Sequence, residues 1–353
     1  MKPECVITGM GLVLPCGTGI EAASASWRSQ QPCFRQLPPE LGSGLGAICD
    51  VSTAGIIPPI LNRRLDRVSR FAWVATHHAL LDADLDPTQI RDRIGLAVGS
   101  VTGGIEASEQ FLRPYLAKGP AGASPMIFPN SVAVAISGHI STAFGLRGCS
   151  TTQLAREACF FAALDQAMRW LRLGMADVMV VIGTDGLSPL FGELLQRSRL
   201  SARHGLPEVG SRRGLLPGEG AQAFILETRD RAETRRARIR ASIRGLTSCA
   251  PATPDPKARG LALAEAASAL TPIPPDAWIA GSSGHPILDE VECALRSRHP
   301  RWPQPRFPKT LWGEFCGSGG QLLAAAAVDL APSVLITAPA SLGAQFATAM
   351  EKP

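Results

Sequence analysis

The stretch DVMVVIGTD (residues 177–185) has the character of an inner strand of a covered sheet. Residues 178–182 form an unbroken apolar run in which β-branched side chains predominate. A strand with one solvated face alternates apolar and polar residues, so a continuous run indicates burial on both faces. Helices must then cover the sheet on both sides. Similar runs at CVIT (5–8), IGLAVGS (94–100) and AFILE (223–227) predict further strands and an α/β fold.

Alanine-rich stretches with helical spacing lie between these strands. RFAWVATHHALLDA (70–83) and CFFAALDQAMRWLRLG (159–174) are two of them, and Gly174 is a suitable helix stop. After residue 228 the same order of strands and helices recurs more weakly. The later segments are RIRASIRGL (238–246), ARGLALAEAASAL (258–270), DAWIAGSS (276–283), SGGQLLAAAAVDL (318–330) and SVLITAP (333–339). We therefore predict two halves of like order, residues 1–228 and 229–353.

Composition excludes several classes of protein. The chain is 45% apolar and 18% charged with a net charge of +5, which indicates a globular protein. The arginine cluster at 229–240 also contains acidic residues and no aromatics, so we expect a solvated helix face and no nucleic-acid binding. A modest basic balance is compatible with an acidic protein partner.

The cysteines and the apolar segments indicate a soluble cytoplasmic protein. Nine cysteines without metal-ligand spacing predict reduced thiols and no metal site, and we expect no cofactor. Gly and Pro interrupt the N-terminal segment, which predicts a strand and a turn and no signal peptide. The segment LLAAAAVDLAPSVLITA (322–338) contains Asp329 and Pro332, so we expect no membrane insertion.

Several motifs together resemble a known family. They are CVITGMGLVLPCGTG (5–19), IGLAVGSVTGG (94–104), GMADVMVVIGTD (174–185), LSARHG (200–205) and PGEGAQAFILE (217–227). Their order is similar to that of elongating β-ketoacyl synthases of the thiolase fold. The resemblance covers most of the chain and implies a five-layered α-β-α-β-α fold of two similar halves, usually dimeric.

The chemistry of that family requires one cysteine and two histidines. A thiolate at a helix N-terminus accepts the acyl chain, and the helix dipole and backbone amides lower the thiol pKa and stabilise the oxyanion. Two histidines assist decarboxylation of the malonyl group. The segments Gly145–Gly148 and Gly174–Asp177 give one gapless register, in which Glu157 occupies the cysteine position.

Cys159 lies two residues beyond that position. Two residues rotate a helical side chain by roughly 200°, so Cys159 faces elsewhere, and the bulky Phe160 and Phe161 follow it. We interpret Cys159 as a buried structural thiol. Glu157 cannot replace the cysteine, because carboxylate attack on a thioester would give a readily hydrolysed mixed anhydride. Its charge suits a helix N-terminus.

Both histidine positions are also changed. In IAGSSGHPILDEVE the family's Pro, Asp and Glu are present as Pro286, Asp289 and Glu292, but Gly281 occupies the first histidine position. We interpret His285 as a loop residue. In KTLWGEFCGSGG the family's Lys309 and Gly313 are present, and Glu314 occupies the second histidine position. With Glu157, Gly281 and Glu314 at the three positions, we expect condensing activity to be lost.

The register predicts that Glu157, Glu314 and Lys309 face the former pocket. Two unpaired carboxylates there would repel each other. Either Lys309 or Arg156 neutralises them, or one carboxyl stays protonated. The C-terminal segment APASLGA (338–344) replaces the family's glycine-rich aromatic gate, and the loop between Leu330 and Val334 is short, so the pocket wall is reduced.

A family member without the triad resembles the chain-length factors of type II polyketide synthases. The resemblance implies a heterodimer with an active ketosynthase, an acyl carrier protein bound by the complex, and a role in shaping the acyl tunnel. The short chain and the carboxylate at the cysteine position are most similar to the partner subunit of aryl-polyene or xanthomonadin-type systems. Met126, Ile127 and Phe128 are candidate tunnel-shaping interface residues, the alternative being ordinary loop packing.

Three alternatives stay open from the sequence. The chain could be an active condensing enzyme that uses Cys159. It could be a hydrolase or decarboxylase that acts on an acyl thioester with Glu157 and Glu314 as an acid–base pair. It could also be a non-catalytic homodimeric scaffold.

Overall fold

A computed structural model describes residues 3–198, 200–202, 205–206, 209–210, 214–329 and 331–353. Arg203 and His204 of the LSARHG motif, and Leu330 before the short loop, lie outside the described residues. Within the described chain, ten strands form one mixed sheet in the order β10-β11-β12-β9-β1-β8-β7-β5-β6, with β2 paired to β1. The strands are β1 (Cys5–Leu14), β2 (Gly17–Thr18), β5 (Ile94–Gly99), β6 (Ser150–Gln153), β7 (Val178–Asp185), β8 (Gly220–Thr228), β9 (Ala241–Cys249), β10 (Ala277–Ala280), β11 (Ser333–Ala338) and β12 (Gln345–Glu351).

The sheet consists of two parts that meet at β1. In the N-terminal part β5 is parallel to β6 and β7, and β8 is antiparallel to both β7 and β1. In the C-terminal part β10 and β11 are parallel, and β12 is antiparallel to β11 and β9. The only link between the parts in the described sheet is a short antiparallel pairing of Cys5–Ile7 with residues 241–243.

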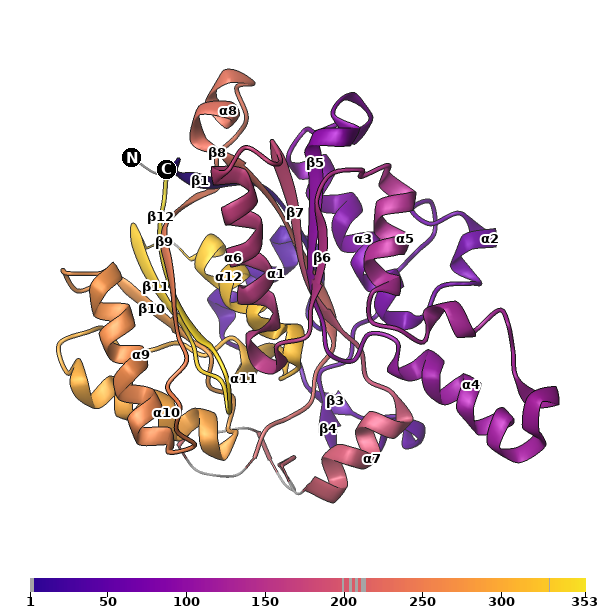
Figure 1. Cartoon of the computed structure of the whole chain (residues 1–353). Helices are drawn as coiled ribbons and strands as arrows, with labels where there is room; N and C mark the ends of the chain where they lie inside the picture. The colour runs from indigo at the N-terminus through magenta and orange to yellow at the C-terminus, as the bar shows by residue number, and fades with distance from the viewer. Residues whose placement is uncertain (1–2, 199, 203–204, 207–208, 211–213, 330) are drawn as a thin grey trace.

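Helices cover the sheet in layers, as Figure 1 shows. The outer layer of the N-terminal part contains α3 (Arg67–Asp82) and α5 (Ala135–Phe144), and that of the C-terminal part contains α9 (Pro256–Leu270) and α10 (Pro286–Arg298). Between the two parts lie α1 (Ile20–Ser29), α6 (Cys159–Arg172) and α12 (Gly319–Val328). The other helices are α2 (Pro59–Asn62), α4 (Ile105–Lys118), α7 (Pro189–Ser198), α8 (Arg229–Thr234) and α11 (Lys309–Trp312), and a small hairpin joins β3 (Arg35–Gln36) to β4 (Leu45–Gly46). The predicted α-β-α-β-α layering of an α/β thiolase-like fold is confirmed.

The first turn of α6 connects the two parts through a pair of aromatic rings. Phe160 packs against Phe224 of β8 with ring centroids 5.6 Å apart, and Phe161 stacks on Phe346 of β12 at 6.1 Å. Both α6 rings are fully buried, and burial of such a side chain contributes roughly 1.5–3 kcal/mol. The bulky residues after Cys159 therefore form the central core.

The predicted elements are present with shifted boundaries. The strand expected at 5–8 continues to Leu14, because the whole segment is buried. The helix expected from residue 70 begins at Arg67, where Asp66 caps it by accepting a hydrogen bond from the Ser69 backbone N–H at 3.0 Å. The division at residues 228 and 229 stays a prediction. No helix in the described residues is long and apolar enough to cross a membrane.

The arginine cluster at 229–240 is not simply a solvated helix face, and this expectation was wrong. Arg235 and Arg231 pair with Glu227, whose side chain is fully buried in β8, and Arg240 pairs with Asp82 at the end of α3. These arginines neutralise carboxylates at the edge of the sheet. Only α8 is helical in this segment.

Candidate functional site

Glu157 lies in the single 3₁₀ turn Arg156–Ala158 that precedes α6. Arg156 before it has a φ of +53°, a left-handed conformation that costs a non-glycine residue about 1 kcal/mol. The Glu157 side chain is only 12% exposed. Its Oε1 accepts a hydrogen bond from Ser341 Oγ at 2.9 Å, and its Oε2 lies 3.7 Å from Arg156 Nε. Ser341 therefore fixes the orientation of this carboxylate.

Cys159 opens α6 and is completely buried. Its thiol donates to the backbone oxygen of Cys316 at 3.2 Å. Burial raises the pKa of Cys159 well above its usual value, and the nearby Asp185 and Cys316 raise it further. A buried thiol in this state is a poor nucleophile. The interpretation of Cys159 as a structural thiol agrees with this environment.

Gly281 follows β10, and its surroundings leave no space for a side chain. A Cβ added to Gly281 would lie 2.8 Å from Pro339 Cδ and 3.2 Å from the Thr337 backbone oxygen. The first of these separations is shorter than real side-chain contacts, so Pro339 would have to move. Pro339 belongs to the segment 338–344 that replaces the family's gate. The residue at position 281 and the segment 338–344 are thus packed against each other.

Glu314 follows α11 and forms a buried ion pair with Lys309. The Lys309 Nζ lies 2.9 and 3.0 Å from the two carboxylate oxygens, and Ser318 Oγ donates to Oε1 at 3.0 Å. The two side chains are 3% and 8% exposed. Backbone hydrogen bonds of 2.9 Å to Leu216 and Gly218 hold the Glu314 main chain against the PGEG segment. Its carboxylate is therefore satisfied and held in place.

The structure answers the charge question that the sequence left open. Lys309 pairs with Glu314, and Arg156 approaches Glu157, so each carboxylate has its own cation. Both carboxylates lie close enough to Cys316 to raise the pKa of its thiol, after the larger effects of burial and Asp185. The two glutamates thus lie near the turn Cys316–Ser318, and the expectation that they face an acyl pocket stays a prediction.

Arg259 of α9 holds the 338–344 loop in place through hydrogen bonds to its backbone. This arginine is almost fully buried, and its guanidinium donates to the Gly343 oxygen at 2.8 Å and to the Ala340 oxygen at 3.3 Å. Together with Pro339 against Gly281 and Ser341 on Glu157, these bonds fix the loop over the former nucleophile position. We refer to residues 338–344 as the latch loop. The altered composition of this loop is visible in the sequence, but no sequence pattern indicates the roles of Arg259, Pro339 or Ser341.

Comparison with known proteins identifies the family of this chain. Residues 2–232 match the β-ketoacyl synthase N-terminal domain. The chain belongs to the β-ketoacyl synthase family. It is 28% identical over 353 residues to the tetracenomycin polyketide synthase ketoacyl synthase beta subunit of Streptomyces glaucescens, covering 94% of this chain and 84% of that protein.

Two solved structures share the fold of this β-ketoacyl synthase family member. The ishigamide ketosynthase/chain length factor aligns with a TM-score of 0.87 at 19% identity, covering 100% of both chains. A type II polyketide synthase acyl-carrier protein in complex with its ketosynthase bound to the hexaketide aligns with a TM-score of 0.84 at 22% identity, covering 99% of this chain and 100% of that one. At these identities the likeness establishes the fold alone.

Glu292 is a retained family position that now lies in a closed environment. Its Oε1 accepts from Thr337 Oγ1 at 2.5 Å, whereas Oε2 is buried without a hydrogen-bond partner among the described residues. Burial raises the pKa of Glu292 to about 8, against the lowering effect of the Thr337 hydrogen bond, and Asp289 adds to the increase. Glu292 is therefore largely protonated at neutral pH.

Pro286 and Asp289 of the same segment form the start of α10. Asp289 accepts from the backbone N–H groups of Gly284 and Gly210, at 3.1 and 2.8 Å. The His285 Nδ1 caps the helix by accepting from Ile287 N–H at 3.2 Å, so His285 is a capping residue at the end of its loop. These residues form and cap the start of α10.

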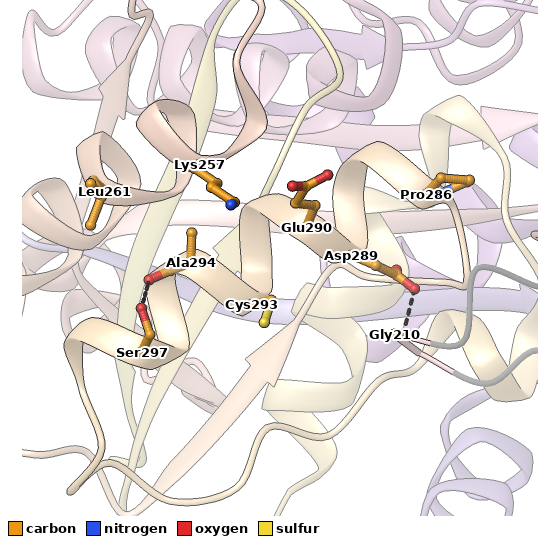
Figure 2. Close-up of a pocket in the computed structure, with 9 residues that line it drawn as sticks. All are labelled: Gly210, Lys257, Leu261, Pro286, Asp289, Glu290, Cys293, Ala294 and Ser297. Atoms are coloured by element: carbon orange, nitrogen blue, oxygen red, sulfur yellow. Dashed lines mark hydrogen bonds between the residues drawn. The ribbon is translucent and has the colours of Figure 1, made fainter.

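A groove of about 520 Å³ lies between α9 and α10 on the outer layer. Figure 2 shows Lys257 and Leu261 of α9 opposite Glu290 and Cys293 of α10, with Asp289 bonded to Gly210 at one end. Glu157, Gly281 and Glu314 do not line it. The groove is therefore separate from these three positions. In the described residues no group of His, Cys, Asp or Glu side chains could hold a metal ion.

The candidate interface residues lie on an exposed apolar face beside α4. Met126 and Phe128 are 63% and 58% exposed, and Ile127 is half-buried. The Phe128 ring packs against Phe111 of α4 with centroids 5.3 Å apart. Exposed apolar side chains also include Leu112, Tyr115 and Leu116 of α4, Val132 and Val134 just before α5, and Leu154 just after β6. Strand β6, at the end of the described sheet, pairs only with β5, so its other edge is open.

Proposed function

We propose that this chain is a non-catalytic ketosynthase-like subunit, a chain-length factor, which pairs with an active β-ketoacyl synthase and shapes its acyl tunnel. The observation that carries the proposal is the closed packing at Gly281. Pro339 occupies the space that a histidine side chain would need, while Glu157 and Glu314 occupy the positions of the cysteine and the second histidine. The family reaction has neither its thiolate nor its histidine pair here.

The proposal is favoured over an enzyme that uses Cys159. The thiol is fully buried, donates its hydrogen to a backbone oxygen and has a raised pKa. An acyl thioester on this sulfur would have to displace the buried rings of Phe160 and Phe161 from the central core. A thiol in this setting neither ionises nor admits a substrate.

The proposal is also favoured over an acid–base pair of Glu157 and Glu314. A general acid or base must be able to exchange a proton with a substrate within hydrogen-bond distance. Glu314 is engaged by Lys309 and Ser318, and Glu157 is held by Ser341 of the latch loop. Each carboxylate is therefore already engaged within the chain.

The exposed apolar side chains and the open edge of β6 favour a protein partner. An open strand edge and exposed apolar side chains are surfaces that soluble proteins normally cover. A second chain of the same fold could add its own edge strand to β6 and cover Met126, Phe128 and Leu154. An active ketosynthase fits this role, because a silent subunit gains a function only beside an active one. A heterodimer with an active ketosynthase is therefore favoured over a homodimeric scaffold.

The relatives support the polyketide context. One is a polyketide synthase ketoacyl synthase beta subunit, and the fold is shared with a ketosynthase/chain length factor and with a type II polyketide synthase ketosynthase in complex with its acyl-carrier protein. We propose that the complex likewise acts on chains carried by an acyl carrier protein in the cytoplasm. The carboxylate at position 157 and the short chain favour the aryl-polyene or xanthomonadin-type subclass.

Co-expression with an active ketosynthase from the same organism tests the proposal. We expect a one-to-one heterodimer in native mass spectrometry. Leu154→Asp, which places a charge next to the open strand edge, should weaken the heterodimer by at least about tenfold in Kd, as expected for a charge at the core of an interface. The matched control is Leu173→Asp, because Leu173 is also an exposed leucine and lies at the C-cap of α6, away from β6. A stable homodimer that ignores the ketosynthase would overturn the proposal.

A further inference from the structure

Four arginines line one pocket between the end of α2 and the first turn of α3. We refer to it as the arginine pocket, and the four side chains are Arg63, Arg64, Arg67 and Arg70. Its volume is about 320 Å³, and residues of α4 and of the segment 126–130 complete its wall. Glu157, Gly281 and Glu314 do not line it, so the pocket is separate from the former catalytic positions.

Arg67 is the only one of the four with an ion-pair partner in the part of the chain that the structure describes. Its guanidinium pairs with Glu219, whose side chain is completely buried, and Nε donates to Oε2 at 2.9 Å. Arg70 has a buried Nε without a hydrogen-bond partner among the described residues. Arg63 and Arg64 are exposed. Because a guanidinium is always charged and can only donate, these unpaired arginines present cationic donors that still need an anion.

The acidic side chains of the pocket do not balance its cations. Asp66 is the N-cap of α3. Burial raises the pKa of Glu106 and Asp66 raises it further, whereas Arg67 and Arg70 act in the opposite direction, so these two arginines lie within electrostatic reach of Glu106. Even when Asp66, Glu106 and Glu219 are all ionised, the four arginines give the pocket an excess positive charge.

Hydrogen bonds tie the two exposed arginines to the segment 126–130. Asn130 Nδ2 donates to the Arg64 backbone oxygen at 2.6 Å, and Asn130 Oδ1 lies 2.7 Å from His139 Nε2 on α5. The Arg63 backbone N–H donates to the Pro59 oxygen of α2 at 3.3 Å. The arginines are therefore held at a fixed place beside this segment.

The arginine pocket adjoins the candidate heterodimer interface. Met126 and Ile127 line it, and exposed Phe128 is the next residue of the chain. A partner chain that covers Met126 also encloses the pocket that Met126 lines. Enclosing a guanidinium without an anion is strongly unfavourable, whereas a carboxylate can pair with it through two parallel hydrogen bonds. The chain that covers this face must therefore bring carboxylates.

We propose that the arginine pocket receives aspartate or glutamate side chains of the active ketosynthase, which pair with Arg63 and Arg64 across the heterodimer interface. This inference rests on the proposed chain-length function and specifies the chemistry of the partner's surface. Charge pairs at the rim of an interface direct association and exclude wrong partners. In a two-fold homodimer both copies would present the same positively charged face. The pocket therefore favours a different chain as the partner.

Modification of the heterodimer with phenylglyoxal, which reacts with arginine, tests the pairing when the labelled peptides are quantified by mass spectrometry. We expect Arg63 and Arg64 to react at least about tenfold more slowly than Arg298 and Arg301. These two references are exposed and lie at and after the C-terminal end of α10, on the outer layer of the C-terminal part. Equal labelling of all four arginines would overturn the proposal.

Repeating the labelling with acyl carrier protein added distinguishes two acidic occupants. Protection of Arg63 and Arg64 that appears only with the carrier protein would assign the pocket to that protein and overturn the proposal. Failure to form any heterodimer would refute the proposed function itself. A heterodimer in which both arginines stay reactive would refute this inference alone.

Charge reversal provides a second measurement. Arg63→Glu/Arg64→Glu should raise the Kd of the heterodimer by at least about tenfold at low ionic strength, with a smaller effect in high salt, because attraction becomes repulsion. Arg298→Glu/Arg301→Glu is the matched control and should leave the Kd unchanged. All four side chains are exposed, so neither exchange removes a buried contact. Equal Kd values for the two double variants would contradict the proposed charge pairs.

Discussion

Replacing Lys309 by methionine removes one partner of the buried ion pair and leaves the Glu314 carboxylate without its cation. Lys309 places its ammonium 2.9 and 3.0 Å from the two oxygens, at exposures of only 3% and 8% for the two side chains. Water cannot replace the lost cation in so closed a site. Removing one member of such a pair typically costs about 3–5 kcal/mol, and the remaining Ser318 hydrogen bond offsets only about 1 kcal/mol of it. We expect Lys309→Met to lower the free energy of unfolding by about 2–4 kcal/mol.

Urea denaturation followed by tryptophan fluorescence measures this change, and Trp312 lies in the same helix as Lys309. The double variant Lys309→Met/Glu314→Leu should recover most of the loss, because it removes both charges together. Arg169→Met is the matched control, since its pair with Asp165 is solvent-exposed and should contribute less than about 1 kcal/mol. A loss below about 1 kcal/mol in Lys309→Met, or no recovery in the double variant, would refute the structural role assigned to the pair.

Four further outcomes are expected. Burial raises the pKa of Glu292 from 4.5 to about 8, so the folded chain keeps this proton between those pH values while the unfolded chain loses it. The free energy of unfolding should therefore fall as the pH rises through this window. In urea titrations at pH 5 to 9, Glu292→Gln should flatten this pH dependence of stability, and an unchanged pH dependence would contradict the assignment. Gly281→His should destabilise the chain by about 1–3 kcal/mol through its clash with Pro339, whereas a thermal scan showing no change would mean that the latch loop yields freely. Glu157→Gln should leave the turnover of the reconstituted complex within a few-fold, and Glu157→Cys should not restore condensation; a large loss for the glutamine variant would instead favour acid–base catalysis. Phe128→Ala and Phe128→Trp should shift product length in opposite directions by liquid chromatography and mass spectrometry, and identical products would exclude Phe128 from the tunnel.

Much of the fold follows from local sequence pattern. The unbroken apolar run at 178–182 predicted β7, because a strand buried on both faces is apolar throughout. The helical spacing of apolar residues in 159–174 predicted α6, because a helix with one buried face has apolar residues every three to four positions. The gapless register located Glu157, and the spacing from Lys309 and Gly313 located Glu314; both carboxylates lie near Cys316. Spacing within a motif locates such residues because the motif's other residues lie close to them in the sequence.

The contacts that close the site leave no such trace. Ser341 reaches Glu157 across 184 positions of sequence, and Arg259 reaches Ala340 across 81. An alanine-rich segment such as 338–344 shows that an aromatic gate is missing, but not that Pro339 fills the space beside Gly281. Nor does pattern distinguish an arginine on a solvated helix from Arg235, which neutralises a buried glutamate on β8. Long-range packing decides these points.

The central claim is that this chain carries no acyl group during chain elongation. Intact-protein mass spectrometry of the heterodimer, after incubation with acyl- and malonyl-loaded carrier protein, tests it most directly. We predict an acyl adduct on the ketosynthase partner and an unmodified mass for this chain. An acyl adduct on this chain that maps to Cys159 and disappears in Cys159→Ala would contradict the account.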